Sequence, residues 1–454
     1  MGGLFNTLTT AADALGVFSN ALTTVGNNVE NSGTPGYARQ DFSVVAQPFD
    51  PREGLPGGIS AGEIQNSRDE YAERAVWTDQ QGFGSADQTV TELTNIQPLF
   101  DVTGNSGIPA ALNALFQSFS ALSVSPNDSV ARSNVISSAT SLTQQFNSAA
   151  TGLGNASLNL NQEIASAAGA INGLTQQIAQ LNTQIDSDPQ GASDPSVDAG
   201  MHNAIESLAA YANVTVLKQP DGSVTLLLDG QTPLVMGDRQ YAIQASTGSG
   251  AAVIQDASGK DVTAQVTGGR LAAMIDIKNT VLPGYNSSLN QLAAGISDQV
   301  NNALLNGVDL AGNQGAQLFS YDSSSDAAST LQVTGITTDQ LAAALPSAPG
   351  GNGNALNLVA LANSPEIGGM TFTQYYSNLA SQVGESLDNA QQNQTTQQDL
   401  LNQAQTTRSN TEGVSLDTEA IKMLEYQRSY QATAHMVTIL NDLTQNLMDM
   451  LASS

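Results

Sequence analysis

The chain has 454 residues, and its 13 Lys and Arg against 41 Asp and Glu give a net charge of −28. At about 150 residues per domain, that length accommodates roughly three domains. Nucleic acid and anionic membrane surfaces are disfavoured as partners, because both recruit clusters of Lys and Arg. Cysteine is absent, which excludes a disulfide scaffold, a thiol nucleophile and thiolate metal ligands. Aromatic residues make up only 5%, so aliphatic helix packing is favoured over an aromatic-rich sheet core.

Neither a cleaved leader nor a membrane helix is expected. Residues 1–20 contain no Lys or Arg, so the positive start of a signal peptide is missing. Residues 164–185 are uncharged and long enough to raise the question of a membrane span, but they are rich in Asn and Gln. We therefore expect a soluble chain, or one exported by a route that leaves no cleavable mark.

The first predicted element is a helix over residues 4–29, whose apolar residues recur with spacings of three and four. This is a heptad seam of about three heptads. Breaker chemistry at 31–36 ends it. The seam consists of Leu4, Leu8, Ala11, Leu15, Phe18, Leu22, Val25 and Val29.

The C-terminus repeats this pattern, again with little charge. A helix at one end could dock on its own domain, but matching heptads at both ends favour an antiparallel pair that leaves apolar surface for neighbouring copies. The C-terminal seam consists of Met423, Tyr426, Tyr430, Thr433, Val437, Leu440, Thr444, Leu447 and Leu451.

A third seam, between residues 153 and 185, predicts a long helix with a Gln- and Asn-rich outer face. A Pro-containing linker at 188–195 follows it. Further helices are expected at 85–99, 109–122, 129–150, 268–306 and 374–410, and residues 307–369 are loop-rich.

After the linker the spacing of apolar residues changes from a helical period toward two, which predicts short strands and a small β domain. The expected strands are 214–217, 224–228, 233–236, 241–245 and 262–266.

The expected fold class is therefore multidomain and mainly α, with a small inserted β domain. Residues 1–40 and 413–454 would form a terminal coiled-coil domain. Residues 41–196 and 268–412 would form an elongated helical rod, and 197–267 the β domain.

No motif carries recognisable catalytic or cofactor chemistry. The two histidines, His202 and His435, lie far apart and in no metal-binding spacing. No phosphate-binding loop is present, and residues 322–326 lack the Gly and closing Glu of a calcium loop. No spacing among the carboxylates singles out an acid and base pair. We expect no catalytic, cofactor or metal site, and a solvated acidic surface.

Two terminal motifs carry a resemblance to a known family. The N-terminal runs NNVEN at 27–31 and TPGYARQ at 34–40, with GVSLDTE at 413–419 and LEYQRSYQA at 424–432, resemble the end motifs of bacterial flagellar rod, hook and hook-associated axial proteins. The matching positions are Asn28, Gly36, Tyr37, Arg39, Gln40, Glu425, Tyr426, Gln427 and Tyr430.

The middle of the chain resembles the junction members of that family, which lie between hook and filament. The resemblance implies a structural, non-enzymatic subunit exported through the flagellar type III apparatus without a cleaved signal. Its implied partners are further copies of itself in a ring, the hook protein, a second junction protein, flagellin-side components and an export chaperone. The assembly interface is expected at Leu8, Ala11, Leu15, Phe18, Leu22, Val25, Val29, Tyr426, Tyr430, Val437, Leu440, Leu447 and Leu451.

Two alternatives stay open. A hook or distal-rod subunit shares both terminal motifs, although the helical seam at 153–185 argues against its usual β-rich middle. An exported flagellar-type protein with an unrecognised enzymatic activity would need a catalytic insert.

Overall fold

The computed structural model describes residues 2–50, 55–100, 106–187, 194–248, 250–323 and 326–452. The chain divides into two compact units. The first comprises Met1–Gln81, Ile171–Ala242 and Gln398–Ser454, and the second comprises Gly82–Ala170 and Ile243–Gln397. The division falls within three long helices, α2 (Glu70–Ile96), α4 (Ser129–Ser187) and α10 (Phe372–Glu412). The three-domain division expected from the sequence stays a prediction.

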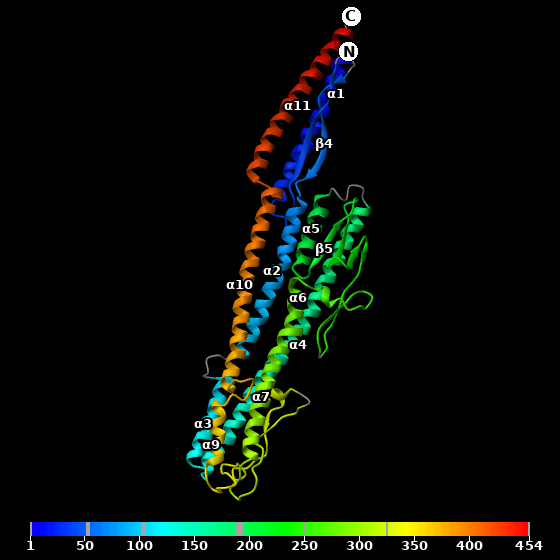
Figure 1. Cartoon of the computed structure of the whole chain (residues 1–454). Coiled ribbons are helices and arrows are strands. Elements are labelled where there is room, and N and C mark those ends of the chain that lie inside the picture. Colours follow the sequence, from blue (N-terminus) through cyan, green and yellow to red (C-terminus); the bar gives the residue numbers. More distant parts are fainter. Residues whose placement is uncertain are drawn as a thin grey trace. The chain divides into compact units, whose positions relative to one another are not determined.

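In the first unit, the terminal helices α1 (Gly2–Glu30) and α11 (Leu416–Ala452) pack along each other. Their free ends lie at the same end of the pair, so they are antiparallel (Figure 1). The expected pairing of the terminal helices is confirmed.

A β-hairpin lies on α1, where the sequence predicted only rod-domain residues. Strands β1 (Gln40–Ala46) and β4 (Ile59–Asn66) pair antiparallel with a bulge between Phe42 and Val44, and β2 (Phe49–Asp50) pairs with β3 (Leu55–Pro56). Most residues of β1 and β4 away from their Gln40 and Ile59 starts are exposed on both faces. Such strands need no alternation of apolar and polar residues, so the sequence pattern did not predict the hairpin.

The first unit also contains the small sheet. Strands β5 (Val214–Lys218), β6 (Val224–Leu228), β7 (Thr232–Met236) and β8 (Arg239–Gln240) are antiparallel in that order, beside α5 (Pro195–Ala209). The strands expected at 214–217, 224–228 and 233–236 are confirmed. The side-chain amide of Asn182 on α4 donates to the carbonyls of Val224 and Gly237, both at 2.8 Å, and thus ties the sheet to the helix.

The second unit is helical around a core of large apolar side chains. Its helices include α3 (Gly107–Val124), α6 (Gly269–Asp276), α7 (Leu282–Leu305), α8 (Ala327–Thr330) and α9 (Gly353–Ala360), with a π-helical stretch at Ile277–Val281 between α6 and α7. The helices expected at 109–122, 268–306 and 374–410 are confirmed. The largest fully buried apolar side chains are Phe119, Phe146, Phe319 and Phe372.

The short strands of this unit were poorly predicted. Pairs form between β9 (Gln244–Ser246) and β10 (Val253–Gln255), and between β11 (Phe319–Ser320) and β12 (Gln332–Val333). The strand expected at 262–266 is wrong: the segment is a 3₁₀ turn, Thr263–Gln265. Hydrogen bonds from Thr263 to the Asp261 carboxylate favour that turn over an extended conformation.

The only basic residue between Ala75 and Leu217, Arg132, lies in the core of this unit. Its guanidinium donates to the backbone carbonyls of Pro126 at 2.7 Å, Thr338 at 2.9 Å and Leu341 at 2.5 Å. The Arg132 side chain thus ties together two loop segments that contain these carbonyls. Among the described helices, none is long and apolar enough to cross a membrane.

Candidate assembly interface

The predicted seam of α1 is buried only in part within the single chain. Ala11 and Val25 are buried, whereas the other predicted positions are half-buried. The fully covered stripe also takes in Val17, Ala21 and Thr24, one residue away from the seam, because α1 packs against both α11 and the hairpin. The half-buried seam positions are Leu4, Leu8, Leu15, Phe18, Leu22 and Val29.

On α11 the predicted seam faces the covered side. Leu440 is buried, and Tyr426 and Val437 are half-buried, but Tyr430 and Leu447 are 39% and 43% exposed. The side chain of Leu451 lies outside the described residues. The role of all these positions in assembly stays a prediction.

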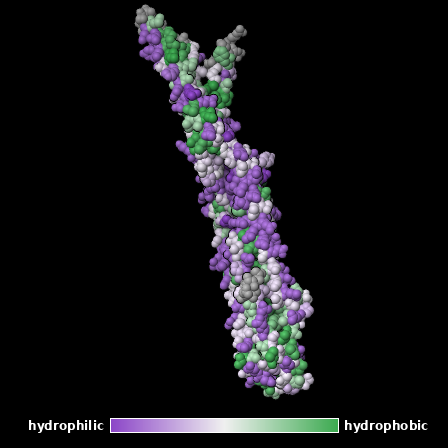
Figure 2. Space-filling model, turned by 90° about the vertical axis from the view of Figure 1, so that its left-hand side faces the viewer, coloured by the Kyte–Doolittle hydropathy of each residue, from purple (hydrophilic) through white to green (hydrophobic). Residues whose placement is uncertain are grey.

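A second apolar face of α11 is exposed. At 100° per residue its members are centred roughly 130° around the helix from the predicted seam. Figure 2 shows apolar surface on the terminal helices. We call this face the α11 stripe, and it consists of Ile421, Leu424, Met436, Ile439 and Leu443.

The N-terminal motif forms a buried hydrogen-bond knot around Asn28. The Asn28 amide nitrogen donates to the Gln40 carbonyl at 2.8 Å and to a Glu419 carboxylate oxygen at 3.0 Å. Its amide oxygen accepts from the Tyr37 hydroxyl and the Gln40 N–H, both at 2.8 Å. Both donor hydrogens and both acceptor lone pairs of the amide are therefore used. This knot joins α1, the start of β1 and the first turn of α11.

Charged neighbours surround the knot. Lys422 lies 3.2 Å from both Glu419 and Asp41, and Arg39 lies 3.0 Å from Asp41. Burial, and then the Glu419 charge, raises the pKa of Tyr37 to about 12. The hydroxyl therefore stays protonated and keeps donating to Asn28.

Gly36 in the same motif has a steric role. Its φ of +77° is in the left-handed region, and an added Cβ would lie 2.4 Å from the Ala199 carbonyl oxygen. Only glycine fits there without moving α5. The Gly36 carbonyl accepts from Arg68 at 2.7 Å, which connects the knot to a second cluster.

That second cluster is centred on the buried guanidinium of Arg68. It pairs with Glu73, with Asp198 and, at 3.4 Å, with Glu412. Glu412 also accepts from the Asp69 N–H at 2.9 Å. Burial and the nearby Glu73 charge raise the pKa of Glu412 to about 7, so its partial protonation relieves the excess of carboxylates. The cluster holds together the starts of α2 and α5 and the end of α10.

The same cluster continues to Arg408 and His202. Arg408 lies 3.2 Å from Glu73 and 2.6 Å from Glu206. His202 contacts the Asp198 carbonyl at 2.9 Å and stacks on Trp77 with ring centroids 5.9 Å apart. Burial, and then the Arg68 charge, lowers the pKa of His202, so its ring is neutral at neutral pH.

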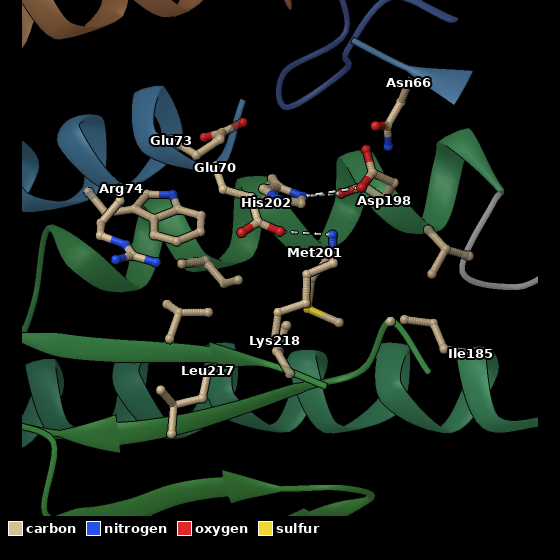
Figure 3. A pocket seen from close by; sticks show the side chains of 16 residues that line it. Asn66, Glu70, Glu73, Arg74, Ile185, Asp198, Met201, His202, Leu217 and Lys218 are labelled. Carbon is tan, nitrogen blue, oxygen red and sulfur yellow. Dashed lines mark hydrogen bonds and ion pairs between the residues drawn. The ribbon is translucent and has the colours of Figure 1, made fainter. Parts of the chain in front are cut away.

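A cavity of about 300 Å³ lies beside this cluster, between α2, α5 and the edge of the small sheet. Figure 3 shows His202, Asp198 and Met201 of α5 on one side and Leu217 and Lys218 of β5 on the other. An ion pair of 3.4 Å between Glu70 and Lys218 joins α2 to β5.

The family-motif residues lie in two different environments, one buried and one exposed. Asn28, Gly36, Tyr37 and Gln40 meet in the knot, and the Arg39 N–H donates to the Glu412 carbonyl at 2.9 Å. Glu425, Gln427 and Tyr430 are exposed on α11, and Tyr426 is half-buried. Sequence reasoning missed Arg68, Glu412 and the role of Glu419. No group of three or more His, Asp or Glu side chains in the described parts of the chain is placed to hold a metal ion.

Comparisons with known proteins bear on what this arrangement does. The family described as "Flagellar hook-associated protein FlgK helical domain" matches residues 93–319, half of the chain. The chain belongs to the flagellar hook-associated protein FlgK family. A second family, "Flagellar basal body rod FlgEFG protein C-terminal", matches residues 406–450, which cover the end of α10 and nearly all of α11.

Individual relatives agree with that membership. Flagellar hook-associated protein 1 of Bacillus subtilis is 26% identical over 99% of both chains. The Salmonella typhimurium protein of the same name is 26% identical over 72% of this chain, which spans 63% of that longer relative. The flagellar hook junction protein FlgK from Burkholderia pseudomallei has the same fold, with a TM-score of 0.67 at 17% identity, covering 75% of this chain and all of that one.

Family membership makes the chain a structural protein of the bacterial flagellum rather than an enzyme. As a FlgK-family protein it is located outside the cell, and it assembles with copies of itself and with other axial components.

Proposed function

We propose that the chain forms the ring that joins hook to filament and permits filament assembly. The observation that carries this proposal is the α11 stripe, an exposed apolar face on a helix that is already paired with α1. The match to the FlgK helical domain at 93–319 supports this role over that of a hook or distal-rod subunit.

In the ring, the α11 stripe packs against the terminal helices of the next copy. Full burial of one Leu, Ile or Met side chain contributes about 1.5–3 kcal/mol relative to full exposure, and the five stripe side chains are each roughly half exposed, so their burial contributes several kcal/mol to a lateral contact. The half-buried seam residues Leu15, Phe18 and Leu22 of α1 complete the contact. The hook protein lies on one side of the ring, and the second junction protein and flagellin-side components lie on the other.

The same stripe explains the expected export partner. An exposed apolar helix face is prone to association before assembly. An export chaperone covers it, and the chain leaves by the flagellar type III route without a cleaved signal.

Ile439→Asp tests the stripe, with Leu158→Asp as a matched control. Both residues are exposed leucine-sized side chains, at 59% and 61%, but Leu158 lies on α4 outside the stripe. Neither change should shift monomer stability by more than about 0.5 kcal/mol. In a strain lacking the native copy, Ile439→Asp should leave hooks without filaments and shed flagellin to the medium, whereas Leu158→Asp should support filaments.

Normal filament numbers with Ile439→Asp would contradict the interface. Loss of the hooks themselves on deletion of the chain would instead favour the hook or distal-rod role. Negative-stain microscopy of the deletion strain distinguishes the two.

A further inference from the structure

A second cavity, of about 370 Å³, lies in the second unit between α4, the π-helical stretch and the start of α7. It combines one buried cation, hydroxyl and amide groups, and an apolar wall. The lining residues used below are Leu153, Gly154, Ser157, Lys278, Leu282 and Asp326.

Lys278 is the unusual member of this lining. Its residue is 6% exposed, and its ammonium donates to the hydroxyl and, at 3.3 Å, to the carbonyl of Ser157. It forms no ion pair with any residue that the structure describes, whereas Lys422 contacts two carboxylates. A buried charge without a counter-ion is costly, and burial accordingly lowers the pKa of Lys278. The ammonium has a third proton to donate.

The backbone is irregular at the same place. Lys278 lies in the π-helical stretch Ile277–Val281. Single π turns inside α-helices are rare and occur frequently at functional sites. The irregular turn, the buried cation and the cavity therefore coincide at one residue.

The acidic residue of the lining limits the charge of a ligand. The Asp326 carboxylate accepts from the side-chain amides of Asn286 at 3.0 Å and Asn290 at 3.1 Å, and it forms no ion pair with any residue that the structure describes. Its charge repels any bound anion, and it repels a dianion about twice as strongly as a monoanion. A ligand with a single negative charge and an apolar part matches the remaining lining.

We propose that this cavity binds a monocarboxylate, with the carboxylate on the Lys278 ammonium and the Ser157 hydroxyl and the apolar part against Leu153 and Leu282. The carboxylate comes either from a free small molecule or from an acidic side chain of a neighbouring copy. The chemistry is the same in both cases, and the experiment separates them.

The probe is sodium propionate, added to the purified full-length chain at constant ionic strength against sodium chloride and sodium sulfate. Amide exchange over 277–281 should slow several-fold with propionate in a saturable way, and not with sulfate. Lys278→Met should abolish the response, while Lys260→Met, which removes an exposed lysine of the same unit, should keep it.

Gly154→Leu provides a second variant that keeps Lys278. An added Cβ at Gly154 meets nothing within 4 Å, and Gly154 lines the cavity, so a leucine there starts in open space and reduces the room for a ligand. Gly169→Leu is its control, because Gly169 is equally open, lies on the same helix and does not line the cavity. Gly154→Leu should lose the propionate response and Gly169→Leu should retain it.

The second arm rests on the proposed junction function. If propionate has no effect but folded Lys278→Met gives fewer filaments per hook than Lys260→Met, the carboxylate is a neighbour's side chain. If exchange does not respond to propionate and filament number does not respond to Lys278→Met, the proposal is overturned. If the chain has no junction role, the wild-type chain itself will not restore filaments in the deletion strain, whereas the propionate measurement on the purified chain is unaffected.

Discussion

Alanine in place of Asn28 should loosen the attachment of α11 to the rest of its unit. The substitution removes four hydrogen bonds at once, to Tyr37, to Glu419 and to both backbone groups of Gln40. Glu419 is fully buried and Gln40 is 6% exposed, so water replaces these partners poorly. Each buried group left unsatisfied costs about 1–3 kcal/mol. Since Tyr37 is only half-buried and Lys422 still contacts Glu419, not every partner incurs the full cost, and we expect a local loss of about 3–5 kcal/mol.

Hydrogen exchange of the purified chain measures this loss where it occurs. Because each 1.4 kcal/mol is a tenfold change, protection over 416–422 should fall roughly 10²- to 4 × 10³-fold. Asn31→Ala is the control, since Asn31 is less buried and its side-chain amide contacts only nearby residues: it donates to the Asn27 carbonyl and accepts from the Thr34 hydroxyl. Equal protection in Asn28→Ala and Asn31→Ala would refute the knot as the attachment of α11.

Three further outcomes are expected. Burial, with the adjacent Glu163, raises the pKa of Glu92 from 4.5 to about 7. The stabilisation of the folded chain by protonated Glu92 is therefore complete below pH 4.5 and is lost as the pH rises through 7. Glu92→Gln should reduce the fall in the free energy of unfolding between pH 5 and 8 by about 2–3 kcal/mol, as measured by denaturant titration. Emission of Trp77, the sole tryptophan, should stay constant from pH 8 to 6.5 and be quenched only at lower pH, when the stacked His202 ionises; a midpoint above 6.5 would be inconsistent with its burial. Phe18→Asp should leave the sheet and the second unit folded but prevent incorporation into hooks, because burial of the unpaired carboxylate in the assembled state costs several kcal/mol. Normal incorporation of this variant in a deletion strain would disprove the seam assignment.

The helices were predictable because burial imposes a period on the sequence. The seam at 153–185 is confirmed as the covered face of α4, where Leu160, Ile164, Ile171 and Ile178 are fully buried. The hairpin was not predictable by the same means. Val44, Val45 and Ile64 are exposed within its strands, so no strict alternation marks them.

The sequence predicted the N-terminal residues of the knot but not their partner on α11. The resemblance singled out Asn28, Tyr37 and Gln40, which lie close together in sequence. Their acidic partner Glu419 is 391 positions from Asn28, and no local pattern reports a contact over that separation. The scarcity of cations was the available signal for Arg68: with 13 Lys and Arg in the chain, a basic residue between a strand and a helix start is a candidate for a structural ion pair.

The Asn28 knot and the Arg68 cluster lie near the end of the α1 seam and the start of the α11 seam, where the N-terminal motif meets the run at 413–419. The seams supply apolar area, which is non-directional and tolerates sliding of one helix along another. The knot at Asn28 and the ion pairs of Arg68 are directional, and they fix where α1 ends and where α11 begins. A subunit whose terminal helices must present the α11 stripe to a neighbour at one height needs that fixed register. In the proposed ring, the buried polar residues therefore specify the position of the interface, and the apolar residues supply its affinity.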